Sequence, residues 1–185
     1  MYETTFSPNR AIEALIFISQ RLADPTIHEV LKIQYFSDKL HFSRFGFMAS
    51  GDKYVAMKFG PVASNTYNAI KAARGERGAW IHPTLVHLVD GAIEIRDGSK
   101  IVPMREADLD QLSPADIECL SEAIKQYGDM PFRERTELSH DDAWKKAWEA
   151  ACDDNVFAGD MSAVDIALTL PNAEEVIEHL NADIQ

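Results

Sequence analysis

The sequence has few cysteines and no long hydrophobic run. Only Cys119 and Cys152 occur among the 185 residues, without CxxC spacing, so we expect neither a zinc site nor a structural disulfide. No apolar segment approaches the ~20 residues needed to cross a bilayer. The N-terminal sequence MYETTFSPNR lacks the basic segment and apolar run of a secretory signal. These absences predict a reduced, cytoplasmic chain with no membrane segment, in which both cysteines are small buried hydrophobic residues.

The motifs of several common classes of enzyme and metal-binding protein are also missing. The sequence contains no GxxxxGK[ST] or GxGxxG loop, no HExxH, no EF-hand loop and no GxSxG elbow. Nucleotide-binding, zinc-protease, calcium-binding and serine-hydrolase interpretations therefore lack support. We expect no catalytic residue, no metal and no cofactor.

Basic residues are outnumbered by acidic ones. There are 18 Lys and Arg against 30 Asp and Glu, which gives a formal net charge of −12. Binding to a phosphate backbone needs a basic face, so direct nucleic-acid binding is not expected, and a basic or neutral partner is favoured. The hydrophobic fraction of 46% with scattered charge is typical of a globular protein.

Helix-start signals divide much of the chain into helices. The pairs Ser7-Pro8 and Ser113-Pro114 each place a serine cap before a proline at the first helical position. Thr26 and Glu29 form a capping box, and the helix that follows is apolar on most sides, as expected of a central core helix.

Three further helical segments are predicted with less local support. Gly60-Pro61 predicts an interruption of the preceding segment, with Pro61 as the first residue of a helix that runs to about Arg74. Ser139 is predicted to cap a helix that continues through Cys152. The segment from Met161 to the C-terminus has the pattern of two short helices that are separated at residues 170–171.

Short β-type runs occur at residues 85–89, 92–95 and 100–103. Asp90-Gly91 and Asp97-Gly98 separate them, and Asp-Gly pairs favour tight hairpin turns. Residues 54–59 also have β-type side chains, but too few to distinguish a strand from a helical turn. The predicted fold is therefore α+β and predominantly α-helical, a single domain with a small antiparallel hairpin or meander packed on helices.

Two groups of polar residues are candidates for chemistry. Asp38 and His41 share one face of the central helix and could act as an acid–base pair or as half of a metal site, or simply fix the following loop. His140 and Trp144 are one helical turn apart, where His140 could bind a carbonyl or carboxylate and Trp144 could lie in the core. An enzyme would bring Asp38, His41 and His140 into one pocket.

The stretch of residues 31–67 carries a resemblance to a known family. The helix end YFSDKLH, a glycine turn at Gly46, the run DKYVAMKFGPV and the tyrosine of the next helix resemble the Panacea domain of SocA-like antitoxins and phage-associated proteins. Ser139-His140 followed by Trp144 resembles a second landmark of that family. The partner-binding or fold-signature residues that the resemblance indicates are Tyr35, Asp38, His41, Asp52, Tyr54, Phe59, Gly60, Pro61, Val62, Tyr67, His140 and Trp144.

The resemblance implies a non-enzymatic antitoxin. Members of the family neutralise a protein toxin, encoded by an adjacent gene, by direct protein–protein binding, and SocA also acts as a proteolytic adaptor that delivers its toxin to the ClpXP protease. A phage or mobile-element interaction protein without a toxin is the alternative, and a small-substrate enzyme is a further one. Homo-oligomerisation stays open.

The resemblance covers about residues 10–152 of the chain. Residues 153–185 are then expected to form a C-terminal helical extension, and residues 1–185 together a single domain.

Overall fold

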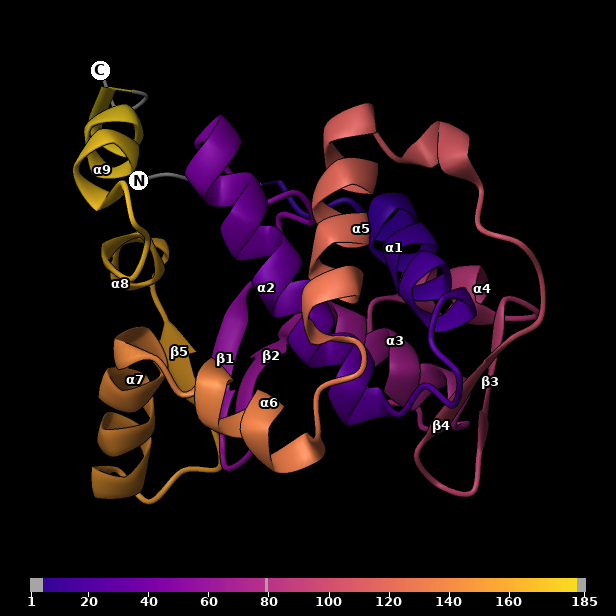
Figure 1. Ribbon diagram of the computed structural model, residues 1–185. Helices are drawn as coiled ribbons and strands as arrows, with labels where there is room; N and C mark the ends of the chain where they lie inside the picture. Colours follow the sequence, from indigo (N-terminus) through magenta and orange to yellow (C-terminus); the bar gives the residue numbers. More distant parts are fainter. Residues whose placement is uncertain (1–4, 79, 183–185) are drawn as a thin grey trace.

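The structure, a computed structural model, describes residues 5–78 and 80–182 (Figure 1). Residues 1–4, 79 and 183–185 of the expected domain lie outside the described residues. The elements in chain order are α1 (Pro8–Gln20), α2 (Ile27–Phe45), β1 (Tyr54–Met57), β2 (Gly60–Ala63), α3 (Ser64–Ala73), α4 (Pro83–Val89), β3 (Ile93–Arg96), β4 (Lys100–Pro103), the 3-10 turn η1 (Leu109–Gln111), α5 (Pro114–Tyr127), α6 (Phe132–Ser139), α7 (Asp142–Asp153), β5 (Gly159–Met161), α8 (Ala163–Leu168) and α9 (Ala173–Ala182). The predicted α+β, mostly helical fold class is confirmed.

Helix α2 lies at the centre of the molecule (Figure 1). Its start is the predicted capping box, in which the Thr26 hydroxyl accepts from Glu29 N and the Glu29 carboxylate accepts from Thr26 N. Its end is Gly46, in the left-handed conformation that favours glycine (φ 80°). Helices α1, α5 and α6 all pack against it, so the local caps set the limits of the helix around which the core is built.

The first sheet has the strand order β2-β1-β5, with both pairings antiparallel. The prediction that Pro61 begins a helix is wrong, because Pro61 lies in β2 opposite Ala56 and α3 begins at Ser64. An edge strand tolerates proline, since its missing N–H can face away from the neighbouring strand. Residues 54–57, which the sequence left undecided, form the central strand.

The second sheet is the hairpin β3–β4, as the sequence predicted for these two runs. Asp97 and Gly98 both have positive φ (49° and 73°), the conformation that an Asp-Gly turn supplies. The predicted strand at residues 85–89 is wrong, because this run is helix α4. The His82 ring accepts from Thr84 N at 3.2 Å, and Pro83 occupies the first helical turn, so a local cap starts the helix.

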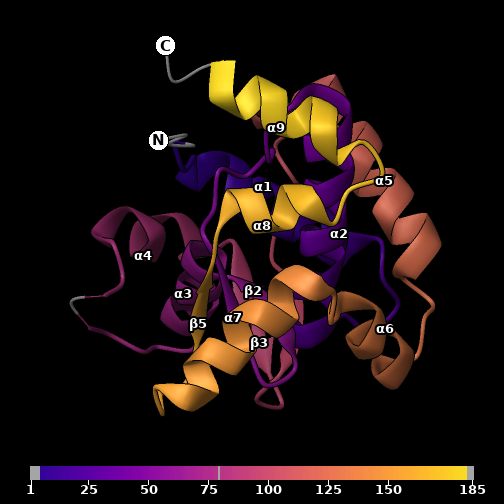
Figure 2. The ribbon, with the colours of Figure 1, turned by 90° about the vertical axis from the view of Figure 1, so that its left-hand side faces the viewer.

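The C-terminal segment packs on α2. Two short helices, α8 and α9, are present as predicted, whereas strand β5 was not predicted; it pairs with β1, with Tyr54 opposite Met161. Asn172 Nδ2 donates to Ser43 O at 2.8 Å, and Ser43 Oγ donates to Asn172 Oδ1 at 2.6 Å. Figure 2 shows α8 and α9 crossing the side of the molecule that also carries β5.

The cysteines differ in their surroundings. Cys119 is buried on α5, as predicted, but Cys152 is exposed near the end of α7, so that part of the prediction is wrong. Both are free thiols. Across residues 5–78 and 80–182, no helix combines the length and the hydropathy that a bilayer span requires.

Candidate functional site

Asp38 fixes the loop that follows α2. Its buried carboxylate accepts hydrogen bonds from Ser50 N (3.2 Å), Ser50 Oγ (2.6 Å) and Tyr54 Oη (2.7 Å). Burial raises the pKa of the Asp38 carboxyl, and these hydrogen bonds oppose that shift. Asp38 therefore joins α2 to β1.

Asp52 performs the same task for α3. Its carboxylate accepts from the backbone N–H groups of Lys53, Asn65 and Thr66 and from the side chains of Asn65 and Thr66, at 2.8 to 3.0 Å. The residue before α3 is Ala63, which has no side-chain acceptor, so Asp52 satisfies the open N–H groups of the first turn. Burial raises the pKa of Asp52, and its hydrogen bonds oppose the rise.

His41 has other partners than Asp38 and joins α2 to α5. Its Nε2 lies 3.2 Å from Asp116 Oδ1, and its Nδ1 lies 2.8 Å from Phe47 O, so both ring nitrogens face acceptors. Burial raises the pKa of Asp116, but the hydrogen bonds from His41 and Ser113 and the charge of Arg10 lower it below its usual value. The hypothesis of an Asp38–His41 acid–base pair is therefore wrong.

Tyr35 and Lys39 hold the start of α7 against α2. Tyr35 Oη and Lys39 Nζ each donate to Asp141 Oδ2 at 2.7 Å, and Asp141 Oδ1 accepts from Trp144 N at 3.1 Å. Asp141 is thus the cap of α7, and the prediction that Ser139 caps this helix is wrong. Ser139 is the buried last residue of α6, where its hydroxyl donates to Thr136 O.

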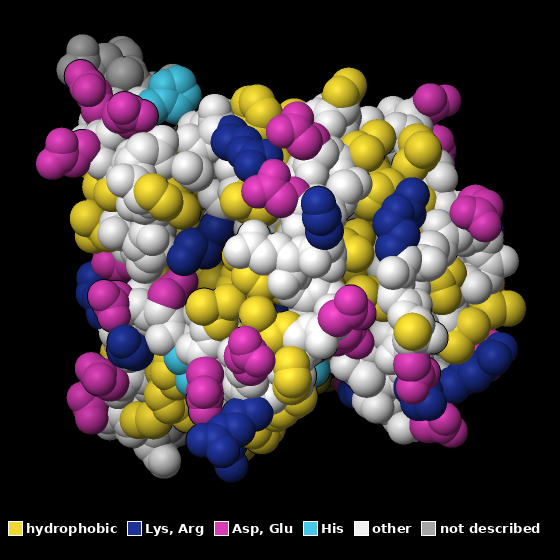
Figure 3. Space-filling model, in the orientation of Figure 1, with side chains coloured by type: hydrophobic (Ala, Val, Ile, Leu, Met, Phe, Trp, Pro, Cys, Tyr) yellow, Lys and Arg dark blue, Asp and Glu magenta, His cyan; other side chains and the backbone are white. Residues whose placement is uncertain are grey.

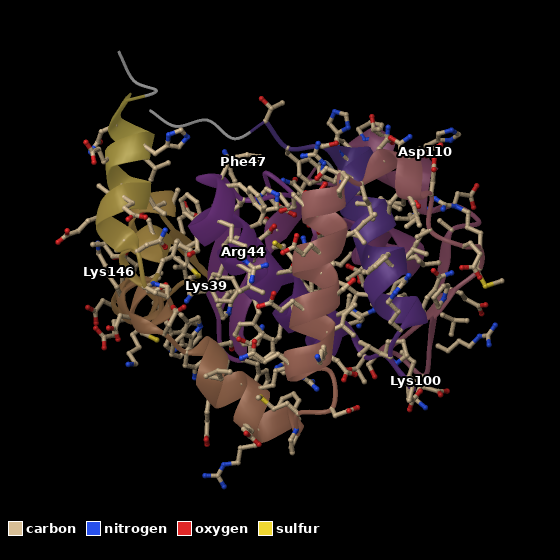
Figure 4. All side chains as sticks on the ribbon, turned by 45° about the horizontal axis from the view of Figure 1, so that its top comes forward. Lys39, Arg44, Phe47, Lys100, Asp110 and Lys146 are labelled. Carbon is tan, nitrogen blue, oxygen red and sulfur yellow. The ribbon has the colours of Figure 1, made fainter. Side chains whose placement is uncertain are left out.

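Figure 4 shows how charged side chains leave opposite sides of α2. Lys39 extends toward α7, while Arg44 lies between α2 and α5, where it pairs with Glu118 at 3.1 Å and Glu122 at 2.6 Å.

His140 and Trp144 form a stacked pair. Their ring centroids are 3.5 Å apart and their planes differ by 2°. Trp144 Nε1 donates to Met57 O at 2.9 Å, which ties α7 to the end of β1. Asp38, His41 and His140 thus have separate partners, and the structure does not bring them into one catalytic pocket.

Lys32 is a functional candidate that sequence analysis missed. It is 1% exposed, and its Nζ donates to Pro61 O at 2.6 Å. Burial lowers the pKa of Lys32 from 10.5 to about 7. The signal in the sequence is a lysine inside a helix that is apolar on most sides, one turn before Tyr35.

Gly60, which has φ 102°, packs directly over Lys32. A Cβ at this position would lie 2.5 Å from Ser139 Oγ and 2.7 Å from Lys32 Cε. Both landmarks of the sequence, the Gly60-Pro61 run and Ser139-His140, therefore meet at this buried lysine.

Substitution of Gly60 tests how tightly the landmarks pack. We expect Gly60→Ala to lower the free energy of unfolding by about 2 to 3 kcal/mol, because the methyl group adds a clash to the strain of a positive φ. Gly75→Ala is the matched control: Gly75 has φ 85° and open space around it, so only the strain of about 1 kcal/mol applies. Urea unfolding of both variants checks this, and equal losses would contradict the packing argument.

The aromatic and aliphatic signature residues divide into core and surface. Tyr35 and Tyr54 are buried and meet edge to face at 5.0 Å, and Val62 and Trp144 are buried too. Tyr67 is half-buried, with Lys71 Nζ 5.0 Å from its ring centroid. Phe59, in the turn between β1 and β2, is 53% exposed.

Phe59 contacts a second exposed aromatic residue, Phe132 at the start of α6. The ring centroids are 5.9 Å apart, Phe132 is 52% exposed, and it packs on the His28 ring at 4.1 Å. We call Phe59 and Phe132 the aromatic pair. Figure 3 shows hydrophobic side chains gathered over the part of the surface where α6 and α7 lie, with charged side chains between them.

The fold and the site define a mostly helical α+β domain whose polar signature residues hold its loops and helices to a central helix. The chain belongs to the Antitoxin SocA-like, Panacea domain family, whose model matches residues 30–145. Comparison with curated proteins and with solved structures gave no match. The resemblance found in the sequence is thereby confirmed.

Proposed function

We propose that this chain is an antitoxin that neutralises a protein toxin by direct binding. The observation that carries the proposal is membership of the SocA-like antitoxin family across residues 30–145, which includes every signature residue described above. The toxin is expected to be encoded by an adjacent gene. Delivery of the bound toxin to a ClpXP-type protease is a second step that the family resemblance suggests.

The aromatic pair is the part of the signature region best suited to contact a partner. Most other signature side chains are buried or bound to neighbouring elements, so they shape the domain from within. Exposed aromatic side chains are enriched in protein interfaces because they bury a large area at little cost in conformational entropy. The net charge of −12 supports a basic or neutral partner surface rather than nucleic acid.

Co-expression with the neighbouring gene product tests the proposal. We expect the chain to restore growth when that product is toxic and to co-purify with it. If no adjacent gene product is neutralised by the chain or co-purifies with it, the antitoxin proposal is contradicted. An interaction protein of a phage or mobile element is then favoured.

A double variant tests the role of the aromatic pair. Phe59→Ser with Phe132→Ser is expected to weaken toxin binding by ten-fold or more, roughly, since interface aromatic residues often contribute over 1 kcal/mol each. Binding is measured by calorimetry, and the unfolding midpoint shows whether the variant stays folded.

The control is a second pair of exposed apolar residues. Met104 and Leu109 are 52% and 46% exposed and lie in the segment between β4 and α5, away from α6 in Figure 1. Met104→Ser with Leu109→Ser should leave toxin binding unchanged. If both double variants bind equally well, the aromatic pair is not the contact surface.

A further inference from the structure

Lys32 is one of three basic side chains that meet beneath the β1–β2 turn. Its charge lowers the pKa values of His28 and His140, although burial is the larger cause for both; the pKa of His28 falls to about 4. In the described part of the chain, Lys32 takes part in no ion pair and donates to one acceptor, Pro61 O, whereas an ammonium group can donate three hydrogen bonds. We call Lys32, His28 and His140 the basic cluster.

Two ring nitrogens of the basic cluster are buried without a partner. His28 Nδ1 and His140 Nε2 are both enclosed and lack a well-formed hydrogen bond among residues 5–78 and 80–182, although the Phe59 backbone lies close enough to the His28 ring to raise its pKa. The great majority of buried polar atoms in proteins are paired, because an unpaired one costs about 1 to 3 kcal/mol. Three basic groups thus lie together with unused hydrogen-bonding capacity.

The surrounding charged side chains do not compensate for this, because they already have partners of their own. Arg135 pairs with Glu29 at 2.9 Å, and Asp141 binds Lys39 and Tyr35. The remaining pairs are Arg133 with Glu137 at 2.8 Å and Lys145 with Asp142 at 3.0 Å. The charges of Asp141 and Glu137 raise the pKa of His140, but both carboxylates pair with other side chains. Within residues 5–78 and 80–182, no carboxylate forms an ion pair with a member of the basic cluster.

The cluster lies close to the surface. The rings of His28 and His140 are partly exposed, although the two unpaired nitrogens are not. Phe132 packs on the His28 ring and contacts Phe59, so the aromatic pair covers this side of the cluster. Gly60 and Ser139 pack tightly against Lys32, so a side chain of a bound protein would have to reach the cluster from the side of these two exposed rings, with the rings moved aside.

We propose that the basic cluster accepts a carboxylate side chain, Asp or Glu, from the bound protein partner. A carboxylate is acceptor-only and negative, so it supplies acceptors for the two unused N–H groups of Lys32 and for an N–H at His140 Nε2, together with the missing counter-charge. His28 Nδ1 donates to it only when that ring is protonated, because the neutral ring uses its N–H at Nε2 toward Thr136. The inference rests on the proposed function, since it assigns the chemistry of the toxin surface that the aromatic pair contacts: an acidic side chain within an otherwise basic or neutral surface.

Binding of a carboxylate next to Lys32 favours the protonated amine, so the complex takes up protons. Lys32 has a pKa of about 7 in the free chain, so above pH 7 we expect binding to be accompanied by proton uptake. In the same pH range, the affinity should fall by up to about ten-fold per pH unit. Calorimetry with the adjacent gene product at pH 7.5, in buffers of different ionisation enthalpy, measures the uptake.

Two variants separate the basic cluster from general electrostatics. Lys32→Met should bind more weakly at pH 7 and lose the pH dependence. Lys125→Met, which removes the same charge from an exposed position on α5, should behave as the wild type. NMR titration of the Lys32 side chain, free and in the wild-type complex, gives an independent reading that needs no variant, and we expect its pKa to rise on binding.

The possible outcomes distinguish the two proposals. If the wild type binds without proton uptake and Lys32→Met binds equally well, the carboxylate site is refuted and the antitoxin function stands. If acetate raises the pKa of Lys32 in the free chain as much as the complex does, the site accepts any small anion and the assignment to a partner side chain fails. If the wild type binds no adjacent gene product, both proposals fail.

Discussion

Lys32→Met is expected to stabilise the free protein by about 3 to 4 kcal/mol at pH 6, an unusual sign for a substitution of a buried residue. A pKa lowered from 10.5 to about 7 corresponds to about 5 kcal/mol of unfavourable free energy for burying the charged amine. Methionine has a similar length and no charge. Loss of the hydrogen bond to Pro61 O reduces the expected gain in stability by about 1 kcal/mol.

The pH dependence gives this prediction a second test. The unfolded chain binds a proton at Lys32 up to about pH 10.5 and the folded chain only up to about pH 7, so the stability of the wild type rises with pH between these values. The advantage of Lys32→Met should therefore be full at pH 6 and small near pH 10. Urea unfolding at several pH values checks this, with Lys125→Met as the control that shows neither effect. A loss of stability in Lys32→Met at pH 6 would contradict the prediction.

The free energy lost by burying the charged Lys32 amine is also relevant to function. A buried amine that destabilises the free domain can be kept because it stabilises a complex, as expected if the basic cluster binds an acidic side chain. Lys32→Met would then be more stable than the wild type and a poorer binder, a combination that loss of folding cannot produce.

Asp52→Ala is expected to have the largest effect in the opposite direction, a loss of about 3 to 5 kcal/mol in the free energy of unfolding. Five hydrogen bonds end on this carboxylate, from Lys53, Asn65 and Thr66. Removing it leaves donors at the start of α3 without an acceptor, and each buried unpaired donor costs about 1 to 3 kcal/mol.

Two comparisons make the Asp52 test specific. Asp52→Asn keeps the shape but turns an NH₂ group toward some of these donors, so an intermediate loss is expected. Asp160→Ala removes an exposed aspartate from β5 of the same sheet and should change stability by less than about 0.5 kcal/mol. Urea unfolding measures all three, and equal losses for Asp52→Ala and Asp160→Ala would show that the network contributes little.

Sequence reasoning succeeded where the determining contacts are local. The caps at Ser7, Thr26 and Ser113 and the turn at Asp97-Gly98 depend on residues within a few positions of each other, and all are present. The family assignment likewise came from a continuous pattern in residues 31–67. Sequence reasoning failed at residues 85–89, which form a helix and not a strand. The start signal of this helix is a histidine cap before Pro83, and histidine is a less common cap than serine or aspartate.

The remaining features depend on contacts between distant parts of the chain. Strand β5 has only three residues and exists because β1 offers it a free edge. Ser139 looks like a helix cap in the sequence, but Asp141 takes that role, held in place by Tyr35 and Lys39 from α2.

The sequence by itself determined the helical fold class, the central helix and the family, because these follow from local caps and continuous motifs. Only the tertiary structure decided which signature residues are internal, and it alone showed that Gly60, Pro61, Ser139 and His140 gather around Lys32. Burial and pairing are properties of a three-dimensional neighbourhood, so a lysine without a counter-ion cannot be distinguished, in the sequence, from one that lies in solvent.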